Sequence, residues 1–499
     1  MLATLLLAKV GLHLLAINQY GYFRDELYYL ASTEHLSWGY VEHPPLSITI
    51  LALVRSLLGD SLPALRLVPL LAGMATIWIT VLLTRALGGG RAAQGLAGIA
   101  CLLSPVFLGT DHYYSMNAID LLLWVLAAWL LVRALTGGRT RDWLVLGFVL
   151  GLGLLNKISV LWLEGGIFLG LFLTPHRRVL LSPGPWIAAL ISLVLFAPHL
   201  VWQARHGWPT LEFMRNATSL KMAATSPGDF LIHQILDMNP GAAPLWIAGL
   251  AFGVWALRGH VGQVLAWIYV VVLIILLAQG HARSSYLAVA YPMLLALGGV
   301  ATERYSRHPW RRWVGPALTG LIVVFGLIAL PMALPILPVR TFVRYQAALG
   351  LAPETEERQE MGVLPQHYAD MFGWEGIVEL VARAYQRLSP EDRASCRVFG
   401  QNYGEAGAVD VLGRKLGLPP ALSGHNSYWL WGPGGQNWEV LIIIGGDPDD
   451  NAAFFDQIEI VGQTHSDWSM PYERGINVSI ARRPRISIGK AWPELKRYI

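Results

Sequence analysis

Residues 22–46 read YFRDELYYLASTEHLSWGYVEHPPL and place charged side chains directly after the apolar run Leu2–Ile17. A longer, mostly apolar region follows them. The ionisable side chains of this stretch include Arg24, Asp25, Glu26, Glu34, Glu42 and His43. Because such groups are costly in hydrocarbon, we expect the stretch to lie at a membrane surface rather than inside the membrane.

Composition places most of the 499-residue chain in a membrane. It is 54% hydrophobic and 14% charged, whereas soluble domains carry about 25% charged residues. The net charge of +4 is mild and does not indicate a nucleic-acid partner. Cys101 lies in an apolar run and Cys396 in a polar region, so no disulfide framework is expected. Leu2–Ile17 is interpreted as a retained helix, because no small-residue cleavage site follows it.

Apolar runs near the length of a membrane-spanning helix, about 20 residues, recur through the first two thirds of the chain. We predict a polytopic α-helical protein with about eleven to thirteen transmembrane helices. The candidate spans are residues 2–18, 62–86, 92–110, 115–135, 142–156, 158–174, 185–204, 240–257, 261–279, 284–302 and 312–335. Two short juxtamembrane helices are expected between the first two spans, one starting at Glu26 and one over residues 46–59.

The arginines predict the orientation of these spans. With eleven spans, the arginine-bearing loops all fall on the side of the N-terminus, which the positive-inside rule makes cytoplasmic. Those arginines are Arg85, Arg91, Arg133, Arg139, Arg141, Arg177, Arg178, Arg258, Arg304, Arg307, Arg311 and Arg312. Loops 19–61, 205–239 and 279–283, and everything after residue 336, then face outward. In a bacterial inner membrane, the C-terminal part would be periplasmic.

The C-terminal third has a different character. We predict a transmembrane domain over residues 1–338 and a small extracytoplasmic α/β domain over residues 339–499. The segment CRVFGQNYGEAGAVDVLGRKLG (396–417) predicts a strand, a turn and an amphipathic helix. EVLIIIGGD, IEIVGQTH and INVSIARR predict further strands. GDPDD (446–450) resembles a metal-binding DxD motif, but a polar turn is the favoured interpretation.

Ionisable side chains recur at the predicted outer surface. Lys157, in GLLNKISVL, ends an apolar span, where an ammonium is costly unless an anion meets it. Others stand near the outer ends of further spans: Asp111, His112, Asn117, Asp120 and Arg283. Each alone could be a structural pair or a snorkelling side chain. Asp25 alone could be the N-cap of a helix that begins at Glu26. Together, these ionisable residues lie at a common predicted depth in the membrane, which favours binding of an anionic, membrane-bound ligand.

Three segments carry a family resemblance: RDELYYLA followed by WGYVEHPPL, then GLLNKISVL, then SSYLAVAYP. They resemble the bacterial protein-mannosyltransferase-like family of GT-C glycosyltransferases, which includes the lipid A aminoarabinose transferases. The resemblance covers roughly residues 1–335, and LPQHYADMFGWEGIV is similar to segments of many bacterial members. It implies an enzyme that moves a sugar from a polyprenyl-phosphate carrier to an acceptor hydroxyl of a lipid, glycan or protein at the outer membrane face. It implies no nucleotide cofactor.

The same resemblance implies roles for individual residues. Asp25 matches the catalytic aspartate of the family, with Glu26 as its neighbour, and Glu42 matches a glutamate that can ligate a divalent metal ion. The residues implied to contact or flank the carrier phosphate are His43, Lys157, Arg283, Tyr40 and Tyr286. Many relatives carry a second acidic residue where this chain has Asn117, or Asp120 nearly one helical turn later.

Two other classes of protein remain open. A polytopic transporter or lipid flippase would also place charged groups in a membrane protein, although transporters often show internal repeats and interrupted helices. A non-catalytic family member that binds the carrier lipid would keep the same acidic pair, Asp25 and Glu26.

Overall fold

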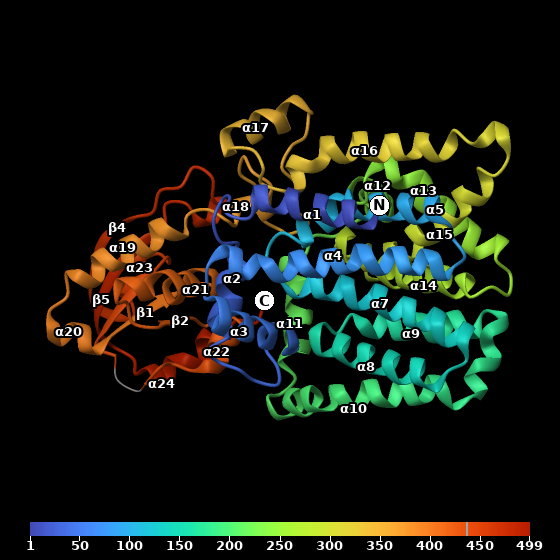
Figure 1. Ribbon diagram of the computed structural model, residues 1–499. Coiled ribbons are helices and arrows are strands. Elements are labelled where there is room, and N and C mark those ends of the chain that lie inside the picture. The colour runs from blue at the N-terminus through green and yellow to red at the C-terminus, as the bar shows by residue number, and fades with distance from the viewer. Residues whose placement is uncertain (436–437) are drawn as a thin grey trace. The chain divides into compact units, whose positions relative to one another are not determined.

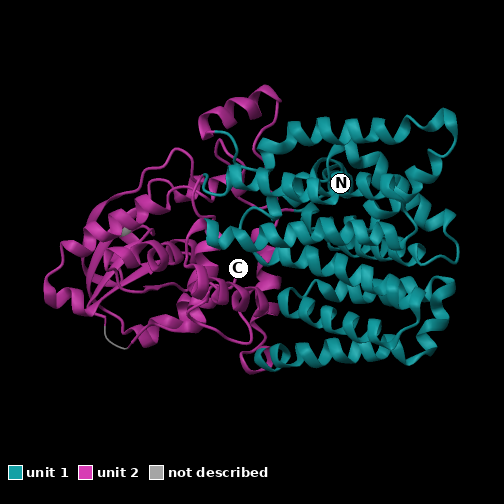
Figure 2. Cartoon of the chain, viewed as in Figure 1, with its two compact units in different colours: residues 1–19, 63–202, 224–337 teal, residues 20–62, 203–223, 338–499 magenta. Residues whose placement is uncertain are grey.

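The computed structural model describes residues 1–435 and 438–499 and is mostly helical (Figure 1). The chain forms two compact units, each made of several segments (Figure 2). The first unit contains residues 1–19, 63–202 and 224–337, and the second contains residues 20–62, 203–223 and 338–499.

The first unit is a bundle whose long helices run side by side (Figure 1). Within the described residues, six helical segments are long and apolar enough to cross a membrane. They are α4 (Leu62–Ala86), α7 (Met116–Gly137), α10 (Pro183–Arg205), α14 (Gly262–Gln279), η5 with α15 (Ser284–Tyr305) and η6 with α16 (Pro309–Ala333). These six agree with predicted spans and make the chain a multi-pass membrane protein.

The remaining predicted spans correspond to shorter helices. They are α1 (Leu2–Ala16), α5 (Arg91–Leu102), α6 (Pro105–Thr110), α8 (Thr140–Asn156), α9 (Val160–Phe172) and α13 (Ala243–Ala251) between two short helical turns. The span predicted over 92–110 is wrong as a single helix, because it breaks between α5 and α6. Ser104 has an extended backbone (φ −74°, ψ 120°), as expected for a residue that precedes proline.

The second unit contains the predicted α/β domain. Its sheet has strands β1 (Cys396–Gly400), β2 (Ala421–Leu422), β3 (Val440–Ile444), β4 (Phe455–Gln463) and β5 (Asn477–Pro484). The strand order is β2-β1-β3-β5-β4. β1 runs parallel to β2 and β3, and β5 runs antiparallel to β3 and β4. The segments predicted as strands are therefore confirmed, and every residue of β3 is buried, as its continuous apolar run predicts.

Helices α19 (Trp374–Gln386) and α21 (Tyr403–Leu412) pack on this sheet. α19 contacts β3, β4 and β5, whereas α21 contacts β1 and β2. The predicted strand–turn–helix of residues 396–417 is thus β1 followed by α21. GDPDD forms a turn and the short helix α23 (Pro448–Ala452), in which Asp447 accepts a hydrogen bond from the Asp449 N–H. The polar-turn interpretation of that motif is confirmed.

Both juxtamembrane helices are present, as α2 (Arg24–Ser32) and α3 (Leu46–Leu58). They belong to the second unit, so its composition is broader than the predicted boundary at residues 338–339. α2 lies against α21 where two glycines allow close approach. A Cβ on Gly404 would lie 2.6 Å from Cγ of Arg24, and one on Gly407 would lie 3.0 Å from the carbonyl carbon of Leu27.

Candidate functional site

The start of α2 separates the roles of two neighbouring carboxylates. The helix begins at Arg24 with Phe23 as its N-cap residue, and Oε2 of Glu26 accepts a hydrogen bond from the Phe23 N–H at 2.9 Å. Glu26 is fully buried. The alternative interpretation of Asp25 as the N-cap is therefore wrong, because the neighbouring Glu26 caps the helix. The Glu26 side chain supplies half of a capping box, so the Asp25 side chain is available for other contacts.

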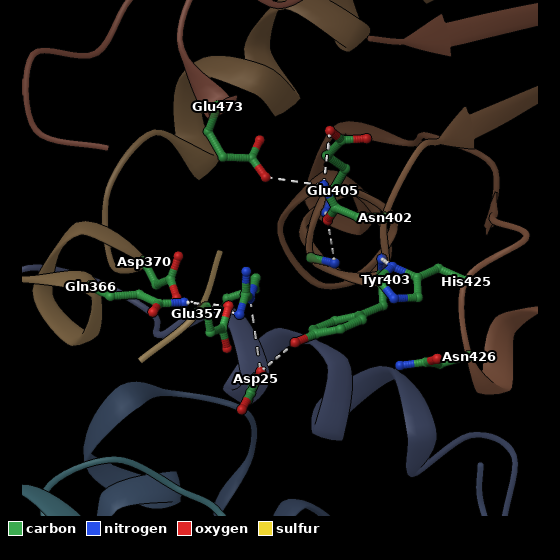
Figure 3. A network of polar contacts seen from close by, with 12 residues as sticks. Asp25, Glu357, Gln366, Asp370, Asn402, Tyr403, Glu405, His425, Asn426 and Glu473 are labelled. Carbon is green, nitrogen blue, oxygen red and sulfur yellow. Dashed lines mark hydrogen bonds and ion pairs between the residues drawn. The ribbon is translucent and has the colours of Figure 1, made fainter. Parts of the chain in front are cut away.

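Asp25 is partly exposed and is held by a side chain from α21. The Tyr403 hydroxyl donates a hydrogen bond of 2.9 Å to Oδ1 of Asp25 (Figure 3). The Arg24 guanidinium lies 3.9 Å from the same oxygen, and the Asp25 side chain is 34% exposed. Asp25 therefore combines a fixed orientation with access from outside the protein.

Arg24 is shared among several acceptors. It lies 3.5 Å from Oδ2 of Asp370, and its guanidinium donates to the Tyr472 hydroxyl at 2.6 Å. Burial raises the pKa of Asp370 to about 6, while the charge of Arg24 opposes that rise. Arg24 thus lies closer to Asp370 than to Asp25, and its positive charge only partly neutralises the Asp25 carboxylate.

Two further buried carboxylates lie in the same network (Figure 3). The side-chain amide of Asn402 donates to Glu405 at 3.1 Å and to Glu473 at 3.0 Å. Burial raises the pKa of both carboxyl groups, and Glu473 adds to the rise at Glu405. Burial therefore favours the protonated forms of Glu405 and Glu473.

Glu42 lies in the loop between α2 and α3 and has one satisfied oxygen. Oε2 accepts hydrogen bonds from Tyr28 at 2.9 Å and Ser427 at 3.4 Å. Burial raises the pKa of Glu42 to about 7, although the Tyr28 hydrogen bond favours the ionised form. Within the part of the chain that the structure describes, Oε1 is buried without a hydrogen bond of ordinary geometry, although the Asn426 side chain lies close enough to favour the ionised form.

That unsatisfied oxygen is the observation that bears on the predicted metal. Among the described residues, no group of three or more His, Cys, Asp or Glu side chains could hold a metal ion. Mg²⁺ is often bound by one or two carboxylates together with substrate phosphates and water. A single unsatisfied carboxylate oxygen does not by itself hold a metal ion, so an ion at Glu42 stays a prediction.

His43 and Tyr40 are both buried in the same loop. The His43 ring packs near the rings of Tyr29 and Tyr40, with centroids 4.9 and 5.0 Å away. The Tyr40 hydroxyl donates to the His35 carbonyl at 3.2 Å. Their contact with phosphate stays a prediction, and both side chains contribute to the packing of the loop.

In the first unit, a second polar cluster forms around Lys157. Its ammonium donates to Oδ1 of Asn117 at 2.8 Å, lies 3.7 Å from Oδ2 of Asp120, and stands 5.3 Å from the centre of the Tyr286 ring. Ser159 also donates to Asp120, at 3.2 Å. Both candidates for the second acidic position thus contact Lys157, because one helical turn of α7 presents both to it.

Arg283 precedes the helical turn η5 (Ser284–Ala290), and its carbonyl accepts a hydrogen bond from the Tyr286 N–H at 3.1 Å. Asp111 belongs to a different cluster from Lys157. It forms a buried ion pair of 2.6 Å with Lys9 of α1, a residue that the sequence interpretation did not use. A lysine inside an otherwise apolar span was the signal for that pair.

Several contact residues of the second unit were also missed. Asp370 lies in the LPQHYADMFGWEGIV segment, so the family resemblance could have identified it. Tyr403 and Ser427 follow no catalytic motif. Their contacts with Asp25 and Glu42 depend on tertiary packing across more than 370 sequence positions.

The fold and these two clusters define the class of protein: a multi-pass membrane protein with an α/β domain in its C-terminal part. The crystal structure of ArnT from Cupriavidus metallidurans bound to undecaprenyl phosphate matches with a TM-score of 0.64 and 13% identity. The match covers 96% of this chain and 97% of ArnT. The predicted GT-C fold is confirmed over nearly the whole chain.

The sequence comparisons agree with the predicted resemblance. Residues 42–202 match the family described as dolichyl-phosphate-mannose-protein mannosyltransferase. Lipid A galacturonosyltransferase RgtD of Rhizobium johnstonii is 28% identical over 193 residues, 38% of this chain and 40% of the relative. Undecaprenyl phosphate-alpha-4-amino-4-deoxy-L-arabinose arabinosyl transferase 1 of Pseudomonas fluorescens is 24% identical over 173 residues. That match covers 34% of this chain and 26% of the relative.

Proposed function

We propose that the protein is a glycosyltransferase that moves a sugar from a polyprenyl-phosphate carrier to an acceptor hydroxyl. The observation that carries this proposal is the match of residues 42–202 to a mannosyltransferase family, on a fold shared with ArnT. The relatives are named as sugar transferases, one of them for lipid A and one for an undecaprenyl-phosphate sugar. These names favour a transferase over a transporter.

In the proposed reaction, the acceptor oxygen attacks the anomeric carbon while the bond from that carbon to the carrier phosphate breaks. Asp25 takes the acceptor proton, and the carrier leaves as polyprenyl phosphate. A single displacement of this kind inverts the anomeric carbon. The partial exposure of Asp25 supports this role, since a general base must reach the proton that it abstracts. In this proposal Glu26 supports Asp25 by capping α2 and does not react.

Cations would offset the charge that develops on the departing phosphate. We assign that role to Lys157 and Arg283, with His43, Tyr40 and Tyr286 as further phosphate contacts. Lys157 holds Asn117 and Asp120 through its present contacts, which would keep its ammonium in place. A divalent ion bound by Glu42 would add positive charge at the phosphate. A lipid phosphate is already a good leaving group, so no nucleotide cofactor is needed.

The proposed acceptor is a lipid, with a lipid-linked glycan or a protein as the other acceptor classes. We further propose that the protein lies in a bacterial inner membrane with its N-terminus in the cytoplasm. Residues 339–499 would then be periplasmic, where sugars arrive on polyprenyl carriers. The arginine-rich loops support this orientation.

Substitution Asp25→Asn tests the proposal. The amide keeps the size of the side chain but cannot take the acceptor proton, so sugar transfer in proteoliposomes should fall about 10²- to 10⁴-fold. Binding of undecaprenyl phosphate and the thermal midpoint should stay near wild type. Sugar transfer within a few-fold of wild type would remove Asp25 from the mechanism.

A further inference from the structure

We propose that Tyr403 is a positioning residue for the Asp25 carboxylate, so that α21 of the C-terminal domain takes part in catalysis. This inference rests on the proposed role of Asp25. The observation behind it is the 2.9 Å hydrogen bond from the Tyr403 hydroxyl to Oδ1 of Asp25 (Figure 3). The two residues are 378 positions apart in the sequence.

The contact constrains one oxygen of a carboxylate that is otherwise partly exposed. The Tyr403 side chain is buried, whereas Asp25 is 34% exposed. Among the described residues, the polar contacts of Asp25 with Tyr403 and Arg24 both involve Oδ1. This arrangement restricts the rotation of the carboxylate through one of its two oxygens. A base must be held in a narrow range of orientations to act efficiently.

The backbone at Tyr403 is anchored at the start of α21. Asn402 is the N-cap residue, and its Oδ1 accepts hydrogen bonds from the N–H groups of Gly404 at 2.8 Å and Glu405 at 3.0 Å. These bonds satisfy N–H groups that a helix leaves unpaired at its first turn. The Cα of Tyr403 is thereby fixed relative to the sheet on which α21 packs.

The ring of Tyr403 is also held in place. The Tyr28 ring lies 4.8 Å away and the His425 ring 4.9 Å away, measured between centroids. The Arg24 guanidinium stands 5.4 Å from the ring centre. Residues of α2 and His425 therefore restrict the phenol. Gly404 and Gly407 let α2 approach closely enough for the hydroxyl to reach Asp25.

The hydroxyl acts as a donor throughout the working pH range. Burial raises the pKa of Tyr403 well above its ordinary value, and the charge of Asp25 raises it further. The phenol therefore keeps its proton, and the carboxylate accepts it in a hydrogen bond without removing it. Tyr403 therefore orients Asp25 without giving it a proton, so Asp25 can still take the proton of the acceptor.

Tyr403→Phe tests the inference because it removes only the hydroxyl. The rate constant kcat for sugar transfer should fall about 10- to 100-fold, since a misoriented base lowers the rate of the chemical step. The KM for the polyprenyl-phosphate sugar and the thermal midpoint should stay near wild type. The matched control is Tyr428→Phe, which removes a hydroxyl that donates to Asp410 at 2.6 Å in the same unit and should leave kcat near wild type.

A double-mutant cycle separates positioning from general loss of structure. Adding Tyr403→Phe to Asp25→Asn should not lower the residual transfer rate further, because residues that act through one another give non-additive effects. Additive losses, or wild-type kcat in Tyr403→Phe alone, would overturn the inference while leaving Asp25 as the base. Normal transfer by Asp25→Asn would instead overturn the proposed function itself.

Discussion

The two polar clusters, one in each unit, contain opposite central charges and differ in how well those charges are compensated. Lys157 has a carboxylate at 3.7 Å, a side-chain amide at 2.8 Å and an aromatic ring beneath it. Asp25 has a neutral phenol at 2.9 Å and a guanidinium at 3.9 Å that also serves Asp370. The cation of the first unit is therefore closely paired, while the carboxylate of the second is oriented but only weakly neutralised.

This difference suits the two proposed roles. A cation in an apolar region needs a counter-ion from the protein when no phosphate is bound, because an isolated charge there is costly. Asp120 is 1% exposed and provides that counter-charge. A base that must accept a proton should instead avoid a close cation, because strong pairing favours the ionised form and weakens the base.

The largest effect is expected from breaking the cluster of the first unit. Lys157→Ala would leave Asp120 buried without its partner, at a cost of about 3–5 kcal/mol in stability. The proposed function also requires that this variant bind undecaprenyl phosphate more weakly than wild type. Vesicle-binding measurements with the purified, folded protein check the affinity, and thermal unfolding checks the stability.

A second substitution distinguishes the two losses. Lys157→Met combined with Asp120→Asn removes both charges, so the stability should recover while binding of undecaprenyl phosphate stays weak. The matched control is Arg139→Ala, which removes a cation at an exposed position in the same unit and should change little. Full recovery of binding in the double variant would show that Lys157 is a structural partner only.

An intermediate effect is expected where α2 meets α21. Gly407→Ala would place a Cβ 3.0 Å from the backbone carbonyl carbon of Leu27, and crowding against backbone typically costs about 1–3 kcal/mol. The thermal midpoint should fall, and sugar transfer should fall with it, because α21 carries Tyr403.

Gly376→Ala in α19 is the control for that substitution. No atom lies within 4 Å of the added Cβ, and alanine is favoured over glycine in a helix by about 1 kcal/mol. Gly376→Ala should therefore raise the midpoint. If both variants were stabilised equally, the close approach of α2 and α21 would not matter for stability.

The sequence predicted the parts of both clusters that depend on local pattern. Asn117 and Asp120 are nearly one helical turn apart, so the 3.6-residue period of a helix places them on the same face. Lys157 is recognisable as a cation at the end of an apolar span. β3 was predictable because VLIII is a continuous apolar run. In each case the physical signal lies within a few residues of the feature that it predicts.

Features that depend on distant packing could not be predicted in this way. The N-cap of α2 is Phe23, which has no capping oxygen, so the local sequence pointed to a helix start at Glu26 and left Asp25 as a possible cap. Tyr403 reaches Asp25 because Gly404 and Gly407 of α21 allow α2 to approach closely. Nothing near residues 22–46 indicates which later segment supplies that contact.

The smallest effect concerns protonation in the second unit. Burial raises the pKa of Glu42 to about 7 and those of Asp370 and Asp410 to about 6, and it also raises that of Glu473. At these carboxyl groups the folded state therefore keeps protons that the unfolded chain releases. Burial lowers the pKa of His425 to about 3, which acts in the opposite direction, but the carboxyl groups outnumber it. Stability falls with pH wherever the folded state binds more protons, so the midpoint of the second unit should fall as pH rises from about 4.5 to about 7.

Glu473→Gln sharpens this prediction because it removes one titrating group and can still accept the hydrogen bond from Asn402. Its midpoint, followed by tryptophan fluorescence in detergent, should depend less on pH than that of wild type, with the gain concentrated at neutral pH. Glu379→Gln, at an exposed position on α19, should leave the wild-type dependence unchanged. A wild-type midpoint that rises between pH 5 and 7 would contradict the assignment, because it requires carboxylates that are ionised more readily in the folded state than in the unfolded chain.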